Sequence, residues 1–160
     1  MIESYYDVTL AASLALLLVY VFLWHRRFDV HITILFVLIP VVNLGYALMN
    51  RAETLEAALA MDKLTFLGGC FLLLDLTLIV FSLCEIRLGR WMRVGLTLAS
   101  IFIYLMALTV GQKPWFYRSV SMVREEGYVV FIKEYGPMHT VFRAVLVAMF
   151  LLGVAAIAYT

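Results

Sequence analysis

The chain has 160 residues, of which 65% are hydrophobic and only 14% are charged, and its formal net charge is +1. Soluble domains contain about 45–50% apolar and about 25% charged residues, and a domain this small cannot bury much more apolar surface. The composition therefore excludes a soluble enzyme, a nucleic-acid-binding protein and a disordered linker as the whole chain. It predicts a polytopic membrane protein.

Five apolar runs are long enough to cross a bilayer, which takes about 20 helical residues. They predict an all-α transmembrane bundle with spans at residues 8–24, 31–49, 64–84, 91–110 and 140–159. The first run follows an acidic segment, MIESYYD, and precedes His25-Arg26-Arg27 instead of a small-residue cleavage site. We therefore expect a retained anchor and not a secretion signal.

The positions of the basic residues predict the orientation in the cell membrane. Two short connections, after the first and the third span, contain Arg26, Arg27, Arg87 and Arg90. Short basic loops stay on the cytoplasmic side, so we expect the N-terminus outside and the C-terminus in the cytoplasm.

Two segments outside the spans have structure-forming patterns. Residues 50–53, Asn-Arg-Ala-Glu, match a capping box, and the stretch that follows favours a helical extension of the third span on the outer side. Residues 119–124 and 128–133 are β-branched and aromatic, and Glu125-Glu126-Gly127 separates them. This pattern predicts an exterior β-hairpin over residues 119–133, lying over the mouth of the bundle, with a positive φ at the glycine.

Asp75 is an ionisable residue near the middle of the third span. A charge at that depth destabilises insertion by at least ~2.5–3.5 kcal/mol, so such residues usually face a cavity or a partner. Asp75 is either a proton-sensitive or ligand-linked switch, or a neutral carboxyl hydrogen-bonded to a neighbouring helix. We expect it inside the bundle, near the polar strip of the second span and the hydroxyls of the fourth span, where Thr97 and Ser100 are candidate partners at similar depth.

A polar strip follows Pro40 in the second span, where the proline is expected to kink the helix. Asn43 and Tyr46 share one face, and Asn50 lies farther along. The strip either lines a ligand vestibule or holds helices together.

The fifth span begins with two further candidates. His139 lies at the outer interface, as a solvated helix-end residue or a pH-sensing group. Arg143, one turn further in, either extends its side chain outward or pairs with Asp75, although the two depths differ by roughly 10 Å.

Small residues indicate close helix packing at Gly68-Gly69 and at Ala11, Ala12 and Ala15. Cys70 and Cys84 fall on one expected helix, too far apart for a disulfide. The sequence shows no nucleophile–base pair, metal-ligand cluster or phosphate-binding glycine loop, and it indicates no cofactor.

Two stretches resemble a known family. The first is Asn43-Leu-Gly-Tyr46-Ala-Leu-Met-Asn50-Arg-Ala-Glu53-Thr-Leu-Glu-Ala, which continues to Lys63-Leu-Thr-Phe-Leu-Gly68-Gly69-Cys70-Phe. The second is Trp115-Phe-Tyr117-Arg-Ser-Val-Ser-Met-Val, followed by Lys133-Glu-Tyr135-Gly136-Pro137-Met-His139-Thr140. Over residues 10–160 the chain resembles the N-terminal seven-transmembrane sensor region of bacterial histidine kinases and diguanylate cyclases.

The resemblance implies a signal-receiving membrane module that binds a small ligand or senses the exterior, and passes the signal to a cytoplasmic output domain. The chain has five expected spans and neither a kinase phospho-acceptor region nor a cyclase signature, so we expect one membrane-embedded domain, 1–160, truncated before that output domain. A small transporter or channel subunit with Asp75 in the translocation path is the alternative. Expected partners are the lipid bilayer, a small ligand, the output domain and a second copy, but no nucleic acid. Candidate ligand-binding or sensing residues are Asn43, Tyr46, Asn50, Asp75, Tyr135, His139 and Arg143.

Overall fold

The computed structural model of the chain describes residues 2–23, 30–125 and 128–160. Within these residues the chain forms five α-helices and one two-stranded antiparallel sheet, which confirms the expected all-α bundle with a hairpin before its last helix. In chain order the elements are α1 (Ile2–Leu23), α2 (Val30–Arg51), α3 (Leu55–Leu83), α4 (Arg90–Ala107), β1 (Tyr117–Glu125), β2 (Tyr128–Tyr135) and α5 (Pro137–Tyr159).

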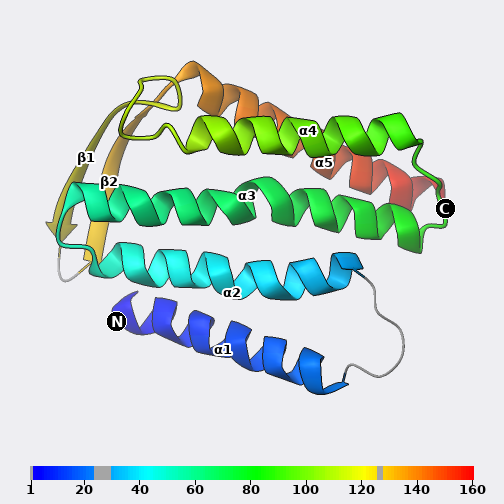
Figure 1. Cartoon of the computed structure of the whole chain (residues 1–160), viewed down its shortest axis with the longest axis horizontal. Helices are drawn as coiled ribbons and strands as arrows, with labels where there is room; N and C mark the ends of the chain where they lie inside the picture. Colours follow the sequence, from blue (N-terminus) through cyan, green and yellow to red (C-terminus); the bar gives the residue numbers. More distant parts are fainter. Residues whose placement is uncertain (1, 24–29, 126–127) are drawn as a thin grey trace.

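The helices lie side by side along the long axis of the molecule (Figure 1), with α3 at the centre, where it contacts α2, α4 and α5. Helix α1 packs against α2 at one side of the bundle. The hairpin lies across one end, beside the N-terminus, and the C-terminus lies at the opposite end. An odd number of helices places the two termini at opposite ends of the bundle.

Each of the five helices is long and apolar enough to cross a membrane. Many of their large apolar side chains point outward, among them Phe22, Trp91, Leu98, Phe150 and Ile157. An apolar exterior of this extent suits lipid, because soluble proteins rarely expose apolar patches beyond a few hundred Å². The chain is a multi-pass membrane protein.

Helices α2 and α3 approach closely at Gly68. A Cβ atom at this position would lie 2.0 Å from Cγ2 of Val42, so no side chain fits there without movement of one helix. Gly69 faces Phe142 of α5, which confirms that the glycine pair permits close packing. Ala11, Ala12 and Ala15 make no such close packing contact with the described helices, since all three are exposed. The buried residue on that stretch of α1 is Ser13.

The junction between α2 and α3 differs from the expected capping box. Helix α2 continues past the buried Pro40 to Arg51, so Asn50 lies in its last turn instead of capping α3. The N-cap of α3 is Thr54, whose Oγ1 accepts a hydrogen bond of 3.2 Å from the amide of Ala57. A threonine hydroxyl is a good N-cap acceptor, and it stands immediately before the helix-favouring LEAALA segment. The expected helical extension at the start of α3 is nevertheless confirmed, since α3 begins at Leu55.

The hairpin forms where it was expected and is slightly longer at both ends. Ser121 pairs with Ile132 and Val123 with Val130, and a register shift at Arg118 brings Tyr117 opposite Tyr135. One extra residue in one strand is a β-bulge, which bends the strand. The connection at residues 126–127, with the glycine that was expected to have a positive φ, lies outside the described residues.

Gly136 fixes the hairpin to the start of α5. A Cβ atom there would lie 2.3 Å from the carbonyl oxygen of Trp115, so the close approach requires glycine. The Gly136 amide donates to the carbonyl of Phe116 at 2.8 Å, and the Met138 amide to that of Trp115 at 3.0 Å. This junction places the ends of both strands against the first turn of α5.

Candidate functional site

A cavity of about 500 Å³ lies under the hairpin, between β2 and helices α2, α3 and α5. Most of its wall is apolar or aromatic, with a few polar side chains at the hairpin side. Its lining residues are Val42, Tyr46, Met49, Asp62, Thr65, Phe66, Gly68, Gly69, Leu72, Leu73, Tyr117, Lys133, Tyr135, His139, Phe142 and Leu146. A concave apolar surface with a small number of placed polar groups is typical of small-molecule sites.

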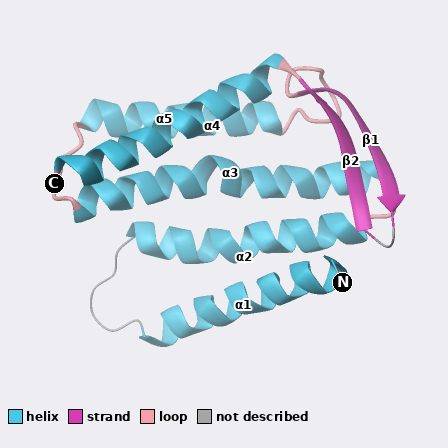
Figure 2. Cartoon of the chain, turned by 180° about the vertical axis from the view of Figure 1, so that it is seen from behind, coloured by secondary structure: helices cyan, strands magenta, loops and turns pink. Residues whose placement is uncertain are grey.

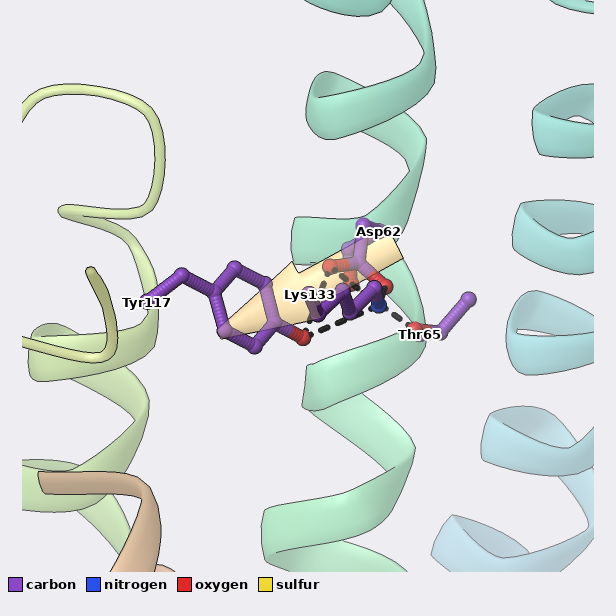
Figure 3. A network of polar contacts seen from close by, with 4 residues as sticks. All are labelled: Asp62, Thr65, Tyr117 and Lys133. Atoms are coloured by element: carbon purple, nitrogen blue, oxygen red, sulfur yellow. Dashed lines mark hydrogen bonds and ion pairs between the residues drawn. The ribbon is translucent and has the colours of Figure 1, made fainter. Parts of the chain in front are cut away.

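The polar groups form one cluster, Asp62, Tyr117 and Lys133, which joins α3 to both strands (Figure 3). The ammonium nitrogen of Lys133 lies 3.2 Å and 3.3 Å from the two carboxylate oxygens of Asp62 and 3.0 Å from the hydroxyl of Tyr117. The Tyr117 hydroxyl donates to Oδ2 of Asp62 at 3.1 Å. Thr65, one turn further along α3, donates to the backbone carbonyl of Asp62 at 2.8 Å.

The charges of Asp62 and Lys133 compensate each other within the cluster. Asp62 and Lys133 have side chains only 5% and 18% exposed, and each ammonium proton of Lys133 has an acceptor within the cluster. The same ammonium lies 4.8 Å from the ring centres of Tyr117 and Phe131, close enough for cation–π attraction. Burial and the neighbouring negative charge of Asp62 raise the pKa of Tyr117, so its hydroxyl remains a hydrogen-bond donor at neutral pH.

An aromatic stack forms the wall on the α5 side. The ring of Tyr135 lies over that of His139, with centres 3.9 Å apart and an interplanar angle of 20°. The guanidinium of Arg143 lies 4.8 Å from the centre of the Tyr135 ring. Phe142 and Phe116 pack edge-on or tilted against this group, which holds the first turn of α5 against the hairpin.

The structure brings three of the seven predicted candidates, Tyr46, Tyr135 and His139, into the cavity wall, and it stacks Arg143 on one of them. Tyr46 also stacks on Tyr6 of α1, with ring centres 6.0 Å apart.

The two asparagines have different contacts. Asn43 donates to the Thr9 carbonyl of α1 at 3.4 Å, as a helix-joining residue would. Asn50 accepts at 3.2 Å from the amide of Val129 and thereby ties α2 to the hairpin. The polar strip is therefore divided between helix packing, the cavity and the hairpin.

Asp75 lies inside the bundle, as predicted, and is 5% exposed, but its partner is not the one expected. Its Oδ1 lies 2.6 Å from Nδ1 of His31, at the start of α2. Thr97 instead donates to the Arg93 carbonyl of its own helix, and Ser100 is fully buried between α3 and α5. The expectation was wrong because Asp75 faces α2 on the side of α3 away from these hydroxyls.

The hypothetical pair of Asp75 with Arg143 is not formed, since each of the two makes the contact described above. Asp75 lies nearly four helical turns along α3 from Asp62, whereas Arg143 lies near the hairpin junction.

A model of the family described as the N-terminal 7TM region of histidine kinase matches residues 8–160. The chain belongs to this family. The family comprises N-terminal sensor regions and not catalytic domains. No match was found among curated proteins or among solved structures.

In this sensor region, sequence analysis missed the charged cluster at the cavity. Neither Asp62 nor Lys133 is among the predicted candidates, although Tyr117 and Lys133 belong to the stretches that carry the resemblance. A signal was present in β2, where Phe131, Lys133 and Tyr135 share one face of the strand, and Lys133 and Tyr135 line the cavity. A lysine on the apolar side of a strand needs a buried partner. The described residues of the sensor region contain no cluster of His, Cys, Asp and Glu suited to a metal ion.

Proposed function

We propose that the chain is the signal-receiving part of a histidine kinase sensor, and that the cavity under the hairpin binds a small ligand. Membership of the family supports the sensor role. The observation that carries the ligand site is the cavity itself, whose volume of about 500 Å³ falls within the range of small-molecule pockets.

The walls of the cavity suggest how ligand binding could reach the rest of the bundle. A ligand there would contact α2, α3, α5 and the hairpin together. The hairpin is joined to α3 by Lys133 and Asp62, to α2 by Asn50, and to α5 by the junction at Gly136. Any ligand that binds one arrangement of these contacts more tightly shifts the population toward it, and the helices extend this change to the far end.

In this proposal the signal passes from the exterior to the cytoplasm. The hairpin faces the exterior, the C-terminus faces the cytoplasm, and the partner that receives the signal is a cytoplasmic output domain, with a second copy of the chain as a further partner. The alternative of a transporter or channel rested on Asp75, which pairs with His31 and does not line the cavity.

Blocking the cavity tests the ligand site. The purified chain in lipid nanodiscs is screened by thermal unfolding with amino acids, short fatty acids, phenols and aromatic amines. Gly69→Leu places a side chain against the cavity, and Gly95→Leu is the matched control, because nothing lies within 4 Å of a Cβ at Gly95. We expect at least one compound to raise the unfolding temperature of the wild type and of Gly95→Leu but not of Gly69→Leu. Equal stabilisation of both variants, or none of the wild type, would refute the site.

A further inference from the structure

A second cavity lies beside the turn between α3 and α4. This turn is at the end of the bundle opposite the hairpin (Figure 2). The volume of the cavity is about 350 Å³. It lies between the start of α2, the last turns of α3, the turn that follows and the start of α4. Its lining residues are His31, Leu78, Phe81, Ser82, Ile86, Arg87, Leu88 and Arg93.

Among the described residues that line this cleft, the ionisable groups are all basic: His31 from α2, Arg87 from the turn and Arg93 from α4. The ion pairs that the structure describes join other residues, and neither arginine takes part in them. Both arginines are exposed, as is the nearby Glu85, which does not line the cleft. Two guanidinium groups that have no acidic partner among the described residues therefore line one concave surface.

His31 is held in the wall of the cleft by Asp75. The contact of 2.6 Å uses Nδ1 of the imidazole, so the ring orientation is fixed by a buried carboxyl of α3. Asp75, Leu78 and Ser82 follow each other at spacings of three and four residues and thus share one face of α3. The carboxyl lies behind the cleft and positions its histidine, while the same helical face supplies the apolar floor and a hydroxyl.

The other half of the cleft is apolar, with Leu78, Phe81 and Leu88 in its wall. The cleft lies at the ends of three helices, which is the level of the lipid headgroups when these helices cross a bilayer. A guanidinium binds phosphate oxygens through two parallel hydrogen bonds, which suits a headgroup phosphate. A ligand that matches both halves has an anionic phosphate attached to an apolar chain.

We propose that this cleft binds the phosphate of an anionic phospholipid, with Arg87 and Arg93 as its main contacts. Ser82 and His31 are further polar groups beside the phosphate, and one acyl chain lies along Leu78 and Phe81. A bound lipid would join α2, α3 and α4 at the end of the bundle where the C-terminus lies. The site is separate from the cavity under the hairpin, so neither proposal depends on the other.

Lipid competition tests the site. The purified chain is released from micelles that contain equal amounts of phosphatidylglycerol and phosphatidylcholine, and bound lipid is counted by native mass spectrometry. We expect one phosphatidylglycerol to be retained preferentially by the wild type. In Arg87→Gln/Arg93→Gln we expect its affinity to fall by about tenfold or more. A tenfold loss corresponds to about 1.4 kcal/mol, which is less than one hydrogen bond to a charged group contributes.

Arg90→Gln is the matched control, because Arg90 is exposed at the same end but does not line the cleft. We expect it to retain the lipid within about twofold of the wild type, because an exposed charge outside the cleft contributes little to binding. An equal loss in Arg90→Gln and in the double variant would show general surface attraction and overturn the site. Equal retention of the two lipids by the wild type would also overturn it.

Two further experiments distinguish a lipid site from a site for a soluble phosphate, and paired hydrogen bonds from charge alone. Glycerol phosphate and inorganic phosphate are added in excess to the lipid-bound wild type. Displacement by either would show a site for a soluble phosphate and overturn the lipid assignment, whereas retention supports it. Arg87→Lys/Arg93→Lys keeps the charge but loses the paired hydrogen bonds, so we expect intermediate retention. Unchanged retention in this variant would contradict the proposed bidentate contact.

Discussion

Lys133 occupies a position that a strand usually fills with an apolar side chain, and its charge is compensated by Asp62, 71 residues earlier in the chain. Removing two charges from water is unfavourable, and their attraction in the interior offsets this only with good geometry and additional hydrogen bonds. Tyr117 supplies such a bond to both partners. The pair therefore specifies where the hairpin lies on α3 more than it adds to the free energy of folding.

Removing either Asp62 or Lys133 should destabilise the chain, because the other charge then stays buried without a partner. We expect Lys133→Met to lower the free energy of unfolding by about 3 kcal/mol, because it leaves the carboxylate of Asp62 buried without a cation. The double variant Asp62→Asn/Lys133→Met should recover most of this loss. Chemical unfolding in detergent micelles measures both values.

Arg51→Met is the control for this experiment. Arg51 pairs with Asp7, but the two side chains are 61% and 45% exposed, so we expect a change of no more than about 1 kcal/mol. If Lys133→Met costs no more than Arg51→Met, the Asp62 pair is not buried as described.

The raised pKa of Tyr117 should make the stability of the folded chain depend on pH. Burial and the Asp62 charge raise its pKa in the folded chain above the ordinary value of 10.0. The unfolded chain therefore loses this proton first. The stability from neutral Tyr117 is complete below pH 10 and declines as the pH rises above that value towards the folded pKa. The difference in phenolate absorbance between wild type and Tyr117→Phe should show no transition near pH 10. A transition there would mean that the hydroxyl is solvated.

The buried charged residues show that burial can be predicted from the sequence, whereas a contact between distant segments cannot. The cost of a charge in the membrane correctly indicated that Asp75 faces inward, because that argument depends on depth alone. Its partner His31 and the pairing of Asp62 with Lys133 could not be predicted, because each contact joins segments more than 40 residues apart and depends on helix rotation.

At the scale of elements, prediction succeeded where the signal is local. The spans follow from hydropathy, and the hairpin follows from two β-branched runs with a short connection between them. The cap of α3 was misplaced because Asn50 and Thr54 are both suitable N-cap residues, and the choice depends on where α2 stops. The close contact of α2 with α3 was visible as Gly68-Gly69, although the partner helix of each glycine was not.

The contact at Gly68 allows a direct test of helix packing. We expect Gly68→Ala to destabilise the chain by about 1–3 kcal/mol, because its Cβ would overlap Val42 and force α2 and α3 apart. Val42→Ala/Gly68→Ala should recover part of the loss, since it removes the methyl group that causes the overlap. Thermal unfolding of the variants in one detergent measures the effect.

Gly95 provides the comparison, because a Cβ there meets no atom within 4 Å. Gly95→Ala should be neutral or stabilising by up to about 1 kcal/mol, the difference in helix propensity between the two residues. If both glycine variants behave alike, the approach of α2 to α3 does not depend on Gly68.

For the whole molecule, the two ends of the bundle differ in chemistry. The end with the hairpin has a cavity whose charged pair is neutral overall, whereas the end with the α3–α4 turn has the cleft with Arg87 and Arg93 and the exposed Arg90. Basic residues in short connections remain on the cytoplasmic side, so this asymmetry gives the bundle one favoured orientation. We therefore expect the cavity under the hairpin to face the exterior, and the cleft proposed to bind a lipid phosphate to face the inner leaflet.

Cysteine labelling in intact cells tests this orientation with residues that the chain offers. Ser119 is exposed on the hairpin, Cys84 is partly exposed at the opposite end, and Cys70 is buried in the core. With a maleimide that cannot cross the membrane, we expect intact cells to label Ser119→Cys and to leave the wild type unlabelled. Permeabilised cells should label Cys84 in both proteins, while Cys70 should react only after unfolding because burial excludes the reagent. Labelling of the wild type in intact cells, with Ser119→Cys protected, would reverse the orientation and place the hairpin in the cytoplasm.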